Sequence, residues 1–358
     1  MSIIARFEIE YLQYLNAEGQ AVAELPPLAR ERERLVKLYQ LMSLVRVFDS
    51  KAIALQRTGK LGTYASCLGH EAAHVGIGAA MQKADIFAPM YREYGTQIYR
   101  GVKPREILLY WGGDERGNNY ANAPHDYAWS VPISTQCLHA AGAAMALKIR
   151  GEAQAAVCVC GDGGSSKADF YGAVNVAGAQ QLPLVLVVVN NQWAISVPRH
   201  LQSGAQTLAQ KAIAGGIEGI QVDGNDLFAV HQAMDTALKR ARAGQGATVV
   251  EMVTYRLSDH TTADDARRYR DDAELEQARA KEPLIRLRHY LTEQGWWDEA
   301  QEEAWLKAAK AQIDVEVEAY LSTPRQPIGA MFDYVYAEIP DELAAQRSAA
   351  IALAERAG

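Results

Sequence analysis

A carboxylate held between glycines and a pair of amides are the residues of this sequence that point most directly to chemistry. Asp162 lies in Gly-Asp-Gly-Gly (161–164) directly after one apolar run, and Asn190 and Asn191 directly follow the next apolar run. Carboxylate and amide oxygens are hard ligands of the kind that Mg²⁺ takes alongside phosphate and water. Glycines let backbone N–H groups approach an anion, and the start of the following helix favours negative charge. The pattern therefore predicts a magnesium–diphosphate site.

The elements that would position these residues alternate between strands and helices. The runs 155–160 and 184–189 are apolar throughout, which is typical of strands buried on both faces, and a helical pattern at 169–180 separates them. The alternation continues with predicted strands at 219–224 and 248–255 and a helix at 226–244. This order predicts an α/β fold with a doubly wound parallel sheet. If the first two strands are neighbours, Asp162 and Asn191 emerge at the same edge.

The remaining segments are predicted to flank this sheet. Helical patterns cover about 31–56 and 70–82, residues 85–95 are predicted as a short strand and loop, and 111–130, rich in Gly, Asn and Pro, as a long ordered loop. A charged helical tail is predicted from about 272 to 322. We expect an N-terminal arm at 1–34, a central domain at 35–325 and a C-terminal segment at 326–358.

Composition narrows the class of protein. The chain has 358 residues, about half of them apolar, and a net charge of -7 with Lys and Arg spread along it, which argues against nucleic acid as the main partner. The four cysteines show no metal-site spacing and are predicted to be reduced thiols. The first residues lack the features of a signal peptide, and no apolar run is long enough to span a bilayer. We therefore expect a cytoplasmic protein without a membrane partner.

Two other interpretations of the glycine segment are less well supported. Gly-Asp-Gly alone, or Asn-Asn alone, is commonly an ordinary turn, but both here end buried strands, which favours a shared site. A nicotinamide-binding Rossmann motif is disfavoured, because the third glycine is missing from its usual place and no acidic residue ends the next strand.

These residues also carry a family resemblance. The segments GDGGSSKADFYGAVNVAGA, NNQWAIS and TYRLSDHTTADDARRYR resemble the alpha subunits of the thiamine diphosphate-dependent decarboxylating component of 2-oxoacid dehydrogenase complexes. The likeness covers roughly 35–325, and it is strongest to bacterial pyruvate dehydrogenase alpha subunits. YREYG and PISTQ also resemble the branched-chain relatives. The resemblance implies the diphosphate-binding module of the thiamine diphosphate fold, with helical extensions at both ends.

The resemblance assigns cofactor ligands one by one. Asp162 and Asn191 would bind Mg²⁺ through their side chains, and Trp193 through its backbone carbonyl. Gly163 and Gly164 would place N–H groups on the diphosphate.

Further assignments concern the rest of the cofactor. Tyr91 and Arg92, in YREYG, would bind the diphosphate, and a guanidinium fork suits that task. The backbone of Val131 and Ile133 would hold the aminopyrimidine. His260 would orient the cofactor or reaction intermediates and serve as the catalytic residue in proton transfer. In the branched-chain relatives, the stretch that contains Val131 and Ile133 also holds a potassium ion. Potassium is therefore a candidate ligand here too, and the matching positions are Ser130, Pro132, Thr135 and Gln136.

Three features depart from the family pattern. Lys167 and Ala168 replace a Gln-Gly or Glu-Gly pair, Gly172 stands where many pyruvate enzymes have Glu, and His70 stands where Gln is usual. These positions lie at or near the cofactor and the mouth of the substrate site. The departures therefore weaken the substrate assignment more than the cofactor assignment.

The resemblance also implies that half of the active site lies on another subunit. In this family the glutamate that activates the cofactor lies on a separate beta subunit, and we find no second module of similar size in this chain. We therefore expect an α₂β₂ tetramer that decarboxylates pyruvate and reductively acylates lipoamide on the lipoyl domain of the acyltransferase component. Branched-chain 2-oxoacids and acetoin are the alternative substrates. A non-catalytic homologue is disfavoured because Asp162, Asn191 and His260 are all present.

Overall fold

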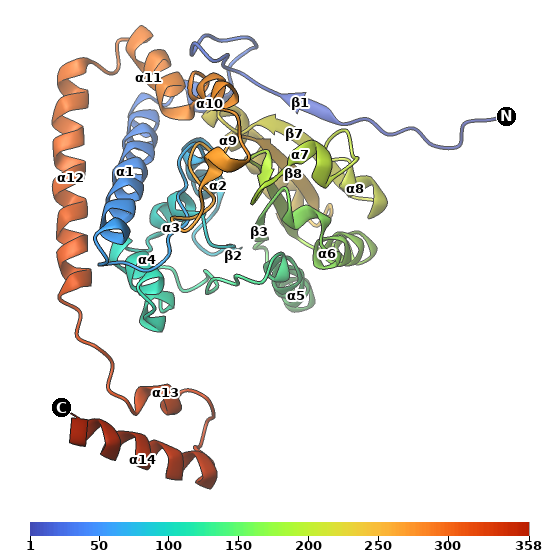
Figure 1. Cartoon of the computed structure of the whole chain (residues 1–358). Coiled ribbons are helices and arrows are strands. Elements are labelled where there is room, and N and C mark those ends of the chain that lie inside the picture. The colour runs from blue at the N-terminus through green and yellow to red at the C-terminus, as the bar shows by residue number, and fades with distance from the viewer. Residues whose placement is uncertain (358) are drawn as a thin grey trace. The chain divides into compact units, whose positions relative to one another are not determined.

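The computed structural model describes residues 1–357, which include a parallel six-stranded sheet (Figure 1). Its strand order is β1-β7-β8-β4-β3-β2, and every neighbouring pair runs parallel. The strands are β1 (Glu10–Leu12), β2 (Ile86–Ala88), β3 (Ala156–Gly161), β4 (Leu184–Asn190), β7 (Glu218–Asp223) and β8 (Thr248–Val253). The predicted parallel α/β sheet is confirmed.

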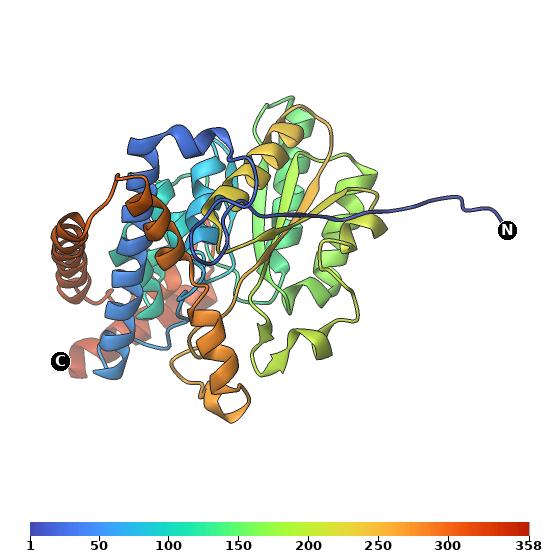
Figure 2. The same cartoon turned by 90° about the horizontal axis from the view of Figure 1, so that it is seen from above.

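The central strand β4 shows why the sheet is covered on both faces. Its side chains alternate, so Leu184, Leu186 and Val188 enter one apolar cluster, whereas the intervening valines enter another. The first cluster includes residues of α5 (Thr135–Arg150), α6 (Ala168–Ala179) and α8 (Lys211–Ala214), and the second includes residues of α2 (Glu71–Ala80) and α9 (Leu227–Arg242). Figure 2 shows helices on both sides of the sheet. The continuous apolar run in the sequence is the signature of this double burial.

A further helical layer covers α2 and the start of α9. Here α1 (Arg32–Arg57) and α11 (Pro283–Glu293) share an apolar cluster with Ala72, Val75 and Phe228. The predicted helices 31–56, 70–82, 169–180 and 226–244 match α1, α2, α6 and α9 within about two residues at each end.

The predicted helical tail is three helices rather than one. They are α10 (Asp272–Arg279), α11 and α12 (Glu299–Leu321). Glu282 caps α11 by accepting the Ile285 N–H at 3.0 Å, and Pro283 occupies its first position. Gly295, with φ of 67°, follows the end of α11 in the left-handed conformation that glycine adopts without strain.

The N-terminal arm contributes a strand that the sequence did not indicate. Residues Glu10–Leu12 pair with β7 at the edge of the sheet, visible in Figure 1. The chain then turns back, and Asp226 Oδ2 accepts the backbone N–H groups of Tyr14 and Leu15 at 2.6 and 2.8 Å. A three-residue strand is too short for a period, and it forms because β7 offers an open edge.

Shorter elements complete the described chain. The predicted loop 111–130 begins at the last residue of α4 and contains a 3₁₀ turn at Glu115–Asn118 and an isolated bridge from Asp126 to Phe87. Two helices, α3 (Tyr94–Arg100) and α4 (Pro104–Trp111), follow β2, and α5 follows the loop; the sequence patterns predict none of the three. The other elements are 3₁₀ turns at Pro27–Arg30, Gly164–Ser166 and Ala266–Arg268, the β5–β6 ribbon (Trp193–Ala194 and Val197–Pro198) and α7 (Arg199–Gln202).

The chain divides into two compact units after Val317. The smaller unit holds the end of α12, α13 (Ala330–Asp333) and α14 (Asp341–Ala357), and within it Arg347 pairs with Asp333 at 2.9 Å. The expected divisions at 34/35 and 325/326 stay predictions. None of the helices among residues 1–357 is long and apolar enough to cross a membrane.

Candidate functional site

The ends of β3 and β4 bring the predicted ligands to one edge of the sheet. The two strands are neighbours, and Gly161 lies opposite Val189 in their register. Asp162 and Asn190–Asn191 therefore emerge side by side, as expected for the carboxyl ends of parallel strands.

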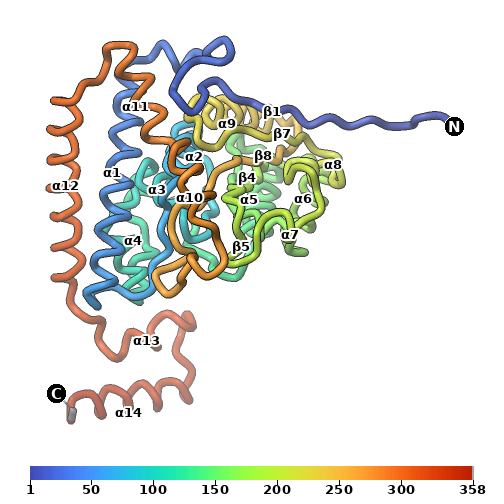
Figure 3. The backbone as a smooth tube through the Cα atoms, turned by 45° about the horizontal axis from the view of Figure 1, so that its top comes forward, coloured from blue at the N-terminus to red at the C-terminus, as the bar shows by residue number. Residues whose placement is uncertain are grey.

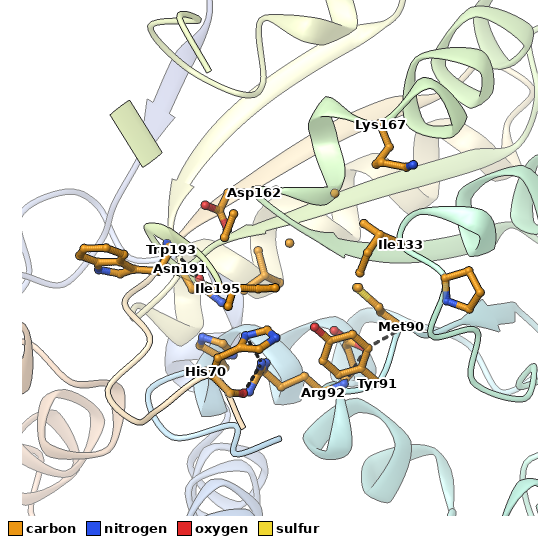
Figure 4. A pocket seen from close by; sticks show the side chains of 18 residues that line it. His70, Met90, Tyr91, Arg92, Ile133, Asp162, Lys167, Asn191, Trp193 and Ile195 are labelled. Atoms are coloured by element: carbon orange, nitrogen blue, oxygen red, sulfur yellow. Dashed lines mark hydrogen bonds between the residues drawn. The ribbon is translucent and has the colours of Figure 1, made fainter. Parts of the chain in front are cut away.

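A cavity of about 520 Å³ opens at this edge (Figure 4). Nine of the ten predicted site residues line it: Tyr91, Arg92, Ile133, Asp162, Gly163, Gly164, Asn191, Trp193 and His260. Val131 does not line the cavity, and the residue is 47% exposed. In Figure 4, Asp162 and Lys167 lie on one side of the cavity, and His70, Tyr91 and Arg92 on the other.

Asp162 has the character of a cation ligand. It is 2% exposed, and its Oδ2 has no hydrogen-bond partner among the described residues. Burial is the main reason that the pKa of this carboxyl rises to about 6. A divalent cation would supply the missing partner and favour the ionised form, so the side chain fits Mg²⁺.

Asn191 and Trp193 offer two more oxygens beside it. The Asn191 Oδ1 accepts the Trp193 N–H at 3.3 Å, and the Trp193 carbonyl accepts from Arg256 at 3.4 Å. Both contacts are long, so both oxygens keep capacity for a further ligand. The indole of Trp193 points away from the cavity in Figure 4 and donates to the Tyr255 hydroxyl at 3.2 Å.

The glycine turn, residues 161–166, approaches its neighbours too closely for side chains. A Cβ on Gly163 would lie 2.7 Å from the Cβ of Ala194, and one on Gly164 would lie 2.8 Å from the Ser134 hydroxyl. That hydroxyl donates to the Gly164 carbonyl at 2.7 Å. Behind the turn, the Lys211 ammonium donates to the Ser165 carbonyl at 2.7 Å. The backbone of the turn is thus fixed, and Gly163 and Gly164 line the cavity, where their N–H groups could meet an anion.

Arg92 lies on the opposite side of the cavity. Its side chain is buried and donates to the carbonyls of Ser66 and His260, the latter at 3.0 Å. Its guanidinium also lies 5.5 Å from the centre of the Tyr91 ring. Both of these hydrogen bonds go to carbonyl oxygens rather than carboxylates, so this buried positive charge is suited to an incoming anion.

His260 is held as a neutral imidazole. Burial, followed by the charges of Arg92 and Arg256, lowers the pKa of His260 to about 3. Its Nδ1 lies 3.4 Å from a guanidinium nitrogen of each arginine. The arrangement fits a tautomer in which Nδ1 is the acceptor.

Sequence reasoning missed Arg256, the buried anchor of the mouth loop, residues 258–270. Figure 3 shows the backbone of this loop between β8 and α10. Arg256 is fully buried and donates to the Ile195 carbonyl at 2.9 Å and the Tyr269 hydroxyl at 2.7 Å. That hydroxyl donates to Asp264, whose carboxylate also accepts the backbone N–H of His260 at 2.9 Å. Ligands bind at the carboxyl ends of parallel strands, and this rule could have found Arg256. Arg256 closely follows β8, which is the neighbour of β4.

The cavity also includes residues that have no role predicted from the sequence. Glu93 is buried, which raises its pKa to about 7, and it accepts the Met90 N–H at 2.9 Å. Lys167 and His70, two of the departures from the family pattern, are lining residues.

The sequence of this chain is similar to those of known proteins. The family described as "Dehydrogenase E1 component" matches residues 39–328. "Pyruvate dehydrogenase E1 component subunit alpha" of Staphylococcus aureus (strain Mu50) is 40% identical over 342 residues, which cover 95% of this chain and 92% of the relative. The protein of the same name from Staphylococcus epidermidis (strain ATCC 12228) is 39% identical over the same lengths.

Proposed function

The chain belongs to the dehydrogenase E1 component family, and we propose that it is the alpha subunit of a thiamine diphosphate-dependent pyruvate dehydrogenase. The observation that carries the proposal is the meeting of Asp162 and Asn191 at adjacent strand ends, in one cavity with Arg92. Pyruvate is proposed as the substrate because the similar proteins from both Staphylococcus species are named for it.

The magnesium ion would be held by oxygens of Asp162, Asn191 and Trp193. The unpartnered Oδ2 of Asp162 supports this assignment. Gly163 and Gly164 would direct N–H groups at the diphosphate, and Arg92 would meet it from the opposite side with the Tyr91 hydroxyl nearby.

The aminopyrimidine end would lie along the stretch that contains Val131 and Ile133. A potassium ion is proposed behind this stretch, with Gln136 among its ligands. Gln136 is buried, its Nε2 donates to the Val159 carbonyl at 2.7 Å, and its Oε1 has no partner among the described residues. An oxygen in that state suits a monovalent cation.

Bound thiamine diphosphate supplies the electron sink for loss of carbon dioxide from a 2-oxoacid. The residues of this chain bind and orient it. His260, neutral and buried beside Arg92, would hydrogen-bond groups at the cavity mouth and move a proton during acyl transfer.

Completion of the site would require a beta subunit with the activating glutamate, in an α₂β₂ tetramer. Exposed apolar side chains at the cavity support a partner surface: Ile133 is 38% exposed and Ile195 is 56% exposed. The tetramer would pass its acyl group to a lipoyl domain of the acyltransferase component. We place this assembly in the cytoplasm.

The decisive test is Asp162→Ala in the assembled tetramer. Without the carboxylate, the diphosphate would face the glycine turn with an incomplete cation site, so we expect thiamine diphosphate to bind at least about 100-fold more weakly, or about 2.7 kcal/mol. Isothermal titration calorimetry in the presence of Mg²⁺ measures this. Asp235→Ala, on the surface of α9, is the control and should leave the affinity unchanged. Equal affinities for the two variants would overturn the metal assignment.

The substrate is tested separately. With an artificial electron acceptor, the wild-type tetramer should oxidise pyruvate with a higher kcat/KM than 3-methyl-2-oxobutanoate or acetoin, and the chain without its partner should show negligible turnover. A preference for the branched substrate would replace pyruvate in the proposal and leave the cofactor site standing.

A further inference from the structure

We propose that His70 is a binding residue of the cavity, where its imidazole hydrogen-bonds an anionic oxygen of the bound ligand. The inference rests on the proposed function, and it assigns a role to a residue that the family pattern does not supply. The oxygen belongs either to the cofactor diphosphate or to the carboxylate of the 2-oxoacid, and the test below distinguishes the two.

The first observation is a pair of buried imidazoles without partners. His70 is 1% exposed and His74, one helical turn later in α2, is fully buried. None of their four ring nitrogens has a hydrogen-bond partner among the described residues. The rings lie edge to face with centroids 5.4 Å apart, so they do not bond each other. Buried polar groups are usually paired, so four unpartnered nitrogens on one helix require an explanation.

The second observation separates the two histidines. His70 lines the cavity and His74 does not. In Figure 4, His70 lies on the same side as Arg92. A ligand that fills the cavity would therefore lie beside His70, whereas His74 is not among the lining residues.

The charges around His70 identify the chemistry of its partner. Burial, with the positive charges of Arg92 and Arg256, holds the pKa of His70 well below its usual range. The ring is thus neutral, with one N–H to donate and one nitrogen to accept. An oxygen anion attracted by those arginines would take the N–H and leave the other ring nitrogen facing the protein.

The local backbone keeps the ring in place. The backbone N–H of His70 donates to the Cys67 carbonyl at 2.9 Å. The His70 carbonyl accepts the backbone N–H of His74 at 2.9 Å, at the start of α2. The preceding Gly69 has φ of 91°, and a Cβ there would lie 2.6 Å from the Tyr255 carbonyl. The ring is therefore presented to the cavity from a fixed turn.

The test uses matched substitutions in the assembled tetramer. His70→Leu removes both nitrogens at similar volume, His70→Gln restores one donor and one acceptor, and His74→Leu is the control for loss of a buried imidazole outside the cavity. Thermal unfolding establishes that each variant is folded. Should the leucine variant fail to fold, His70→Ala takes its place under the same criteria.

Two measurements distinguish the sources of the anion. Calorimetry gives the affinity for thiamine diphosphate with Mg²⁺, and steady-state decarboxylation with saturating cofactor gives kcat/KM for pyruvate. We expect His70→Leu to lower one of them about tenfold or more, as loss of a hydrogen bond to a charged group does. A loss in cofactor affinity assigns the bond to the diphosphate, and a loss in kcat/KM alone assigns it to the carboxylate. His70→Gln should recover most of the loss, and His74→Leu should show none.

The inference is overturned if His70→Leu matches the wild type in both measurements, or if His74→Leu reproduces its loss. These outcomes differ from failure of the proposed function, in which the wild-type tetramer itself would neither bind thiamine diphosphate nor decarboxylate a 2-oxoacid.

Discussion

The glycine turn and the mouth loop border the same cavity but are built in different ways. The turn continues directly from β3, and its shape is set by close packing against Ala194 and Ser134. The mouth loop has one 3₁₀ turn and is held by side chains, above all by Arg256, Asp264 and Tyr269. A strand end positions a ligand through the backbone, whereas a loop of this kind needs a buried anchor.

This contrast affects what each region can tolerate. In the glycine turn an added methyl group meets packed atoms, so any side chain at Gly163 displaces backbone. In the mouth loop, removal of one anchor releases several bonds together, because Arg256 and Asp264 meet at the Tyr269 hydroxyl. We therefore expect substitutions in the turn to lower the affinity for thiamine diphosphate. Substitutions in the loop should instead make the loop itself less ordered.

Of the variants that compare the turn with the loop, Gly163→Ala should have the largest effect. The new Cβ would lie 2.7 Å from the Ala194 Cβ, and overpacking of this kind costs about 1–3 kcal/mol. If the turn shifts to relieve it, thiamine diphosphate affinity falls by up to about 100-fold. Calorimetry measures the loss. Gly142→Ala, in an open position of α5, should bind cofactor normally, and normal binding by both variants would mean that the turn is not rigid.

The next effect tests the other side of the comparison. Arg256→Met keeps the apolar stem but removes the donors to Ile195 and Tyr269. We expect cleavage by trypsin within residues 258–270 to become about tenfold faster or more, because the loop opens more often. Cofactor affinity should change less than in the Gly163 variant. Mass spectrometry locates the cuts.

The control for that experiment lies in the same loop. Arg267 is 83% exposed in its side chain and pairs only with its near neighbour Asp265 among the ion pairs of the loop. Arg267→Met also removes a tryptic site, so chymotrypsin, which cleaves at Tyr269, serves for the comparison of the two variants. Equal protection of the two variants would show that Arg256 is not the anchor.

A smaller effect concerns the acidity of Asp162. Its pKa in the folded chain, about 6, exceeds the ordinary value of 3.8, so the folded state binds this proton more tightly than the unfolded state. The resulting stabilisation is present at low pH and is lost as pH rises through about 6. Without Mg²⁺ and cofactor, Asp162→Asn should therefore be more stable than wild type at pH 8 by on the order of 2 kcal/mol, or a few degrees in Tm.

The same pair of proteins should converge at pH 4, where the wild-type carboxyl is protonated in the folded state. Thermal unfolding at both pH values measures the difference, with Asp235→Asn as the surface control. A wild type that is the more stable protein at pH 8 without Mg²⁺ would show that the carboxylate already has a compensating partner.

The sequence predicted the position of the glycine turn because the turn comes directly at the end of a buried strand of the sheet. A continuous apolar run marks a doubly covered strand, and neighbouring parallel strands bring Asp162 and Asn191 together without further information. His260 required the family resemblance, since a lone histidine in a polar loop has no period or register. Its neighbour Arg256 is only four residues away, but its other neighbour, Arg92, comes from a distant segment of the chain.

Elements that depend on distant partners were missed for the same reason. The strand Glu10–Leu12 exists only because β7 leaves an edge, and the role of Arg256 depends on carbonyls near β5 and on a tyrosine thirteen residues later. The helical tail was predicted as one segment because its composition is uniform, while Pro283 and Gly295 at the ends of α11 divide it. Short-range patterns locate elements, and tertiary contacts decide their ends and anchors.

The smallest effect on cofactor binding is expected from His260→Ala. The imidazole contacts two arginines at 3.4 Å, and neither contact is a strong bond, so affinity for thiamine diphosphate should stay within about tenfold, or 1.4 kcal/mol. Transfer to lipoamide should suffer more than decarboxylation measured with an artificial electron acceptor, because in the proposed function a residue at the cavity mouth would meet the incoming lipoyl group. His200→Ala, on exposed α7, is the control. If both assays slow equally, His260 acts at or before decarboxylation. The mouth loop would then help to position the cofactor, as the glycine turn does.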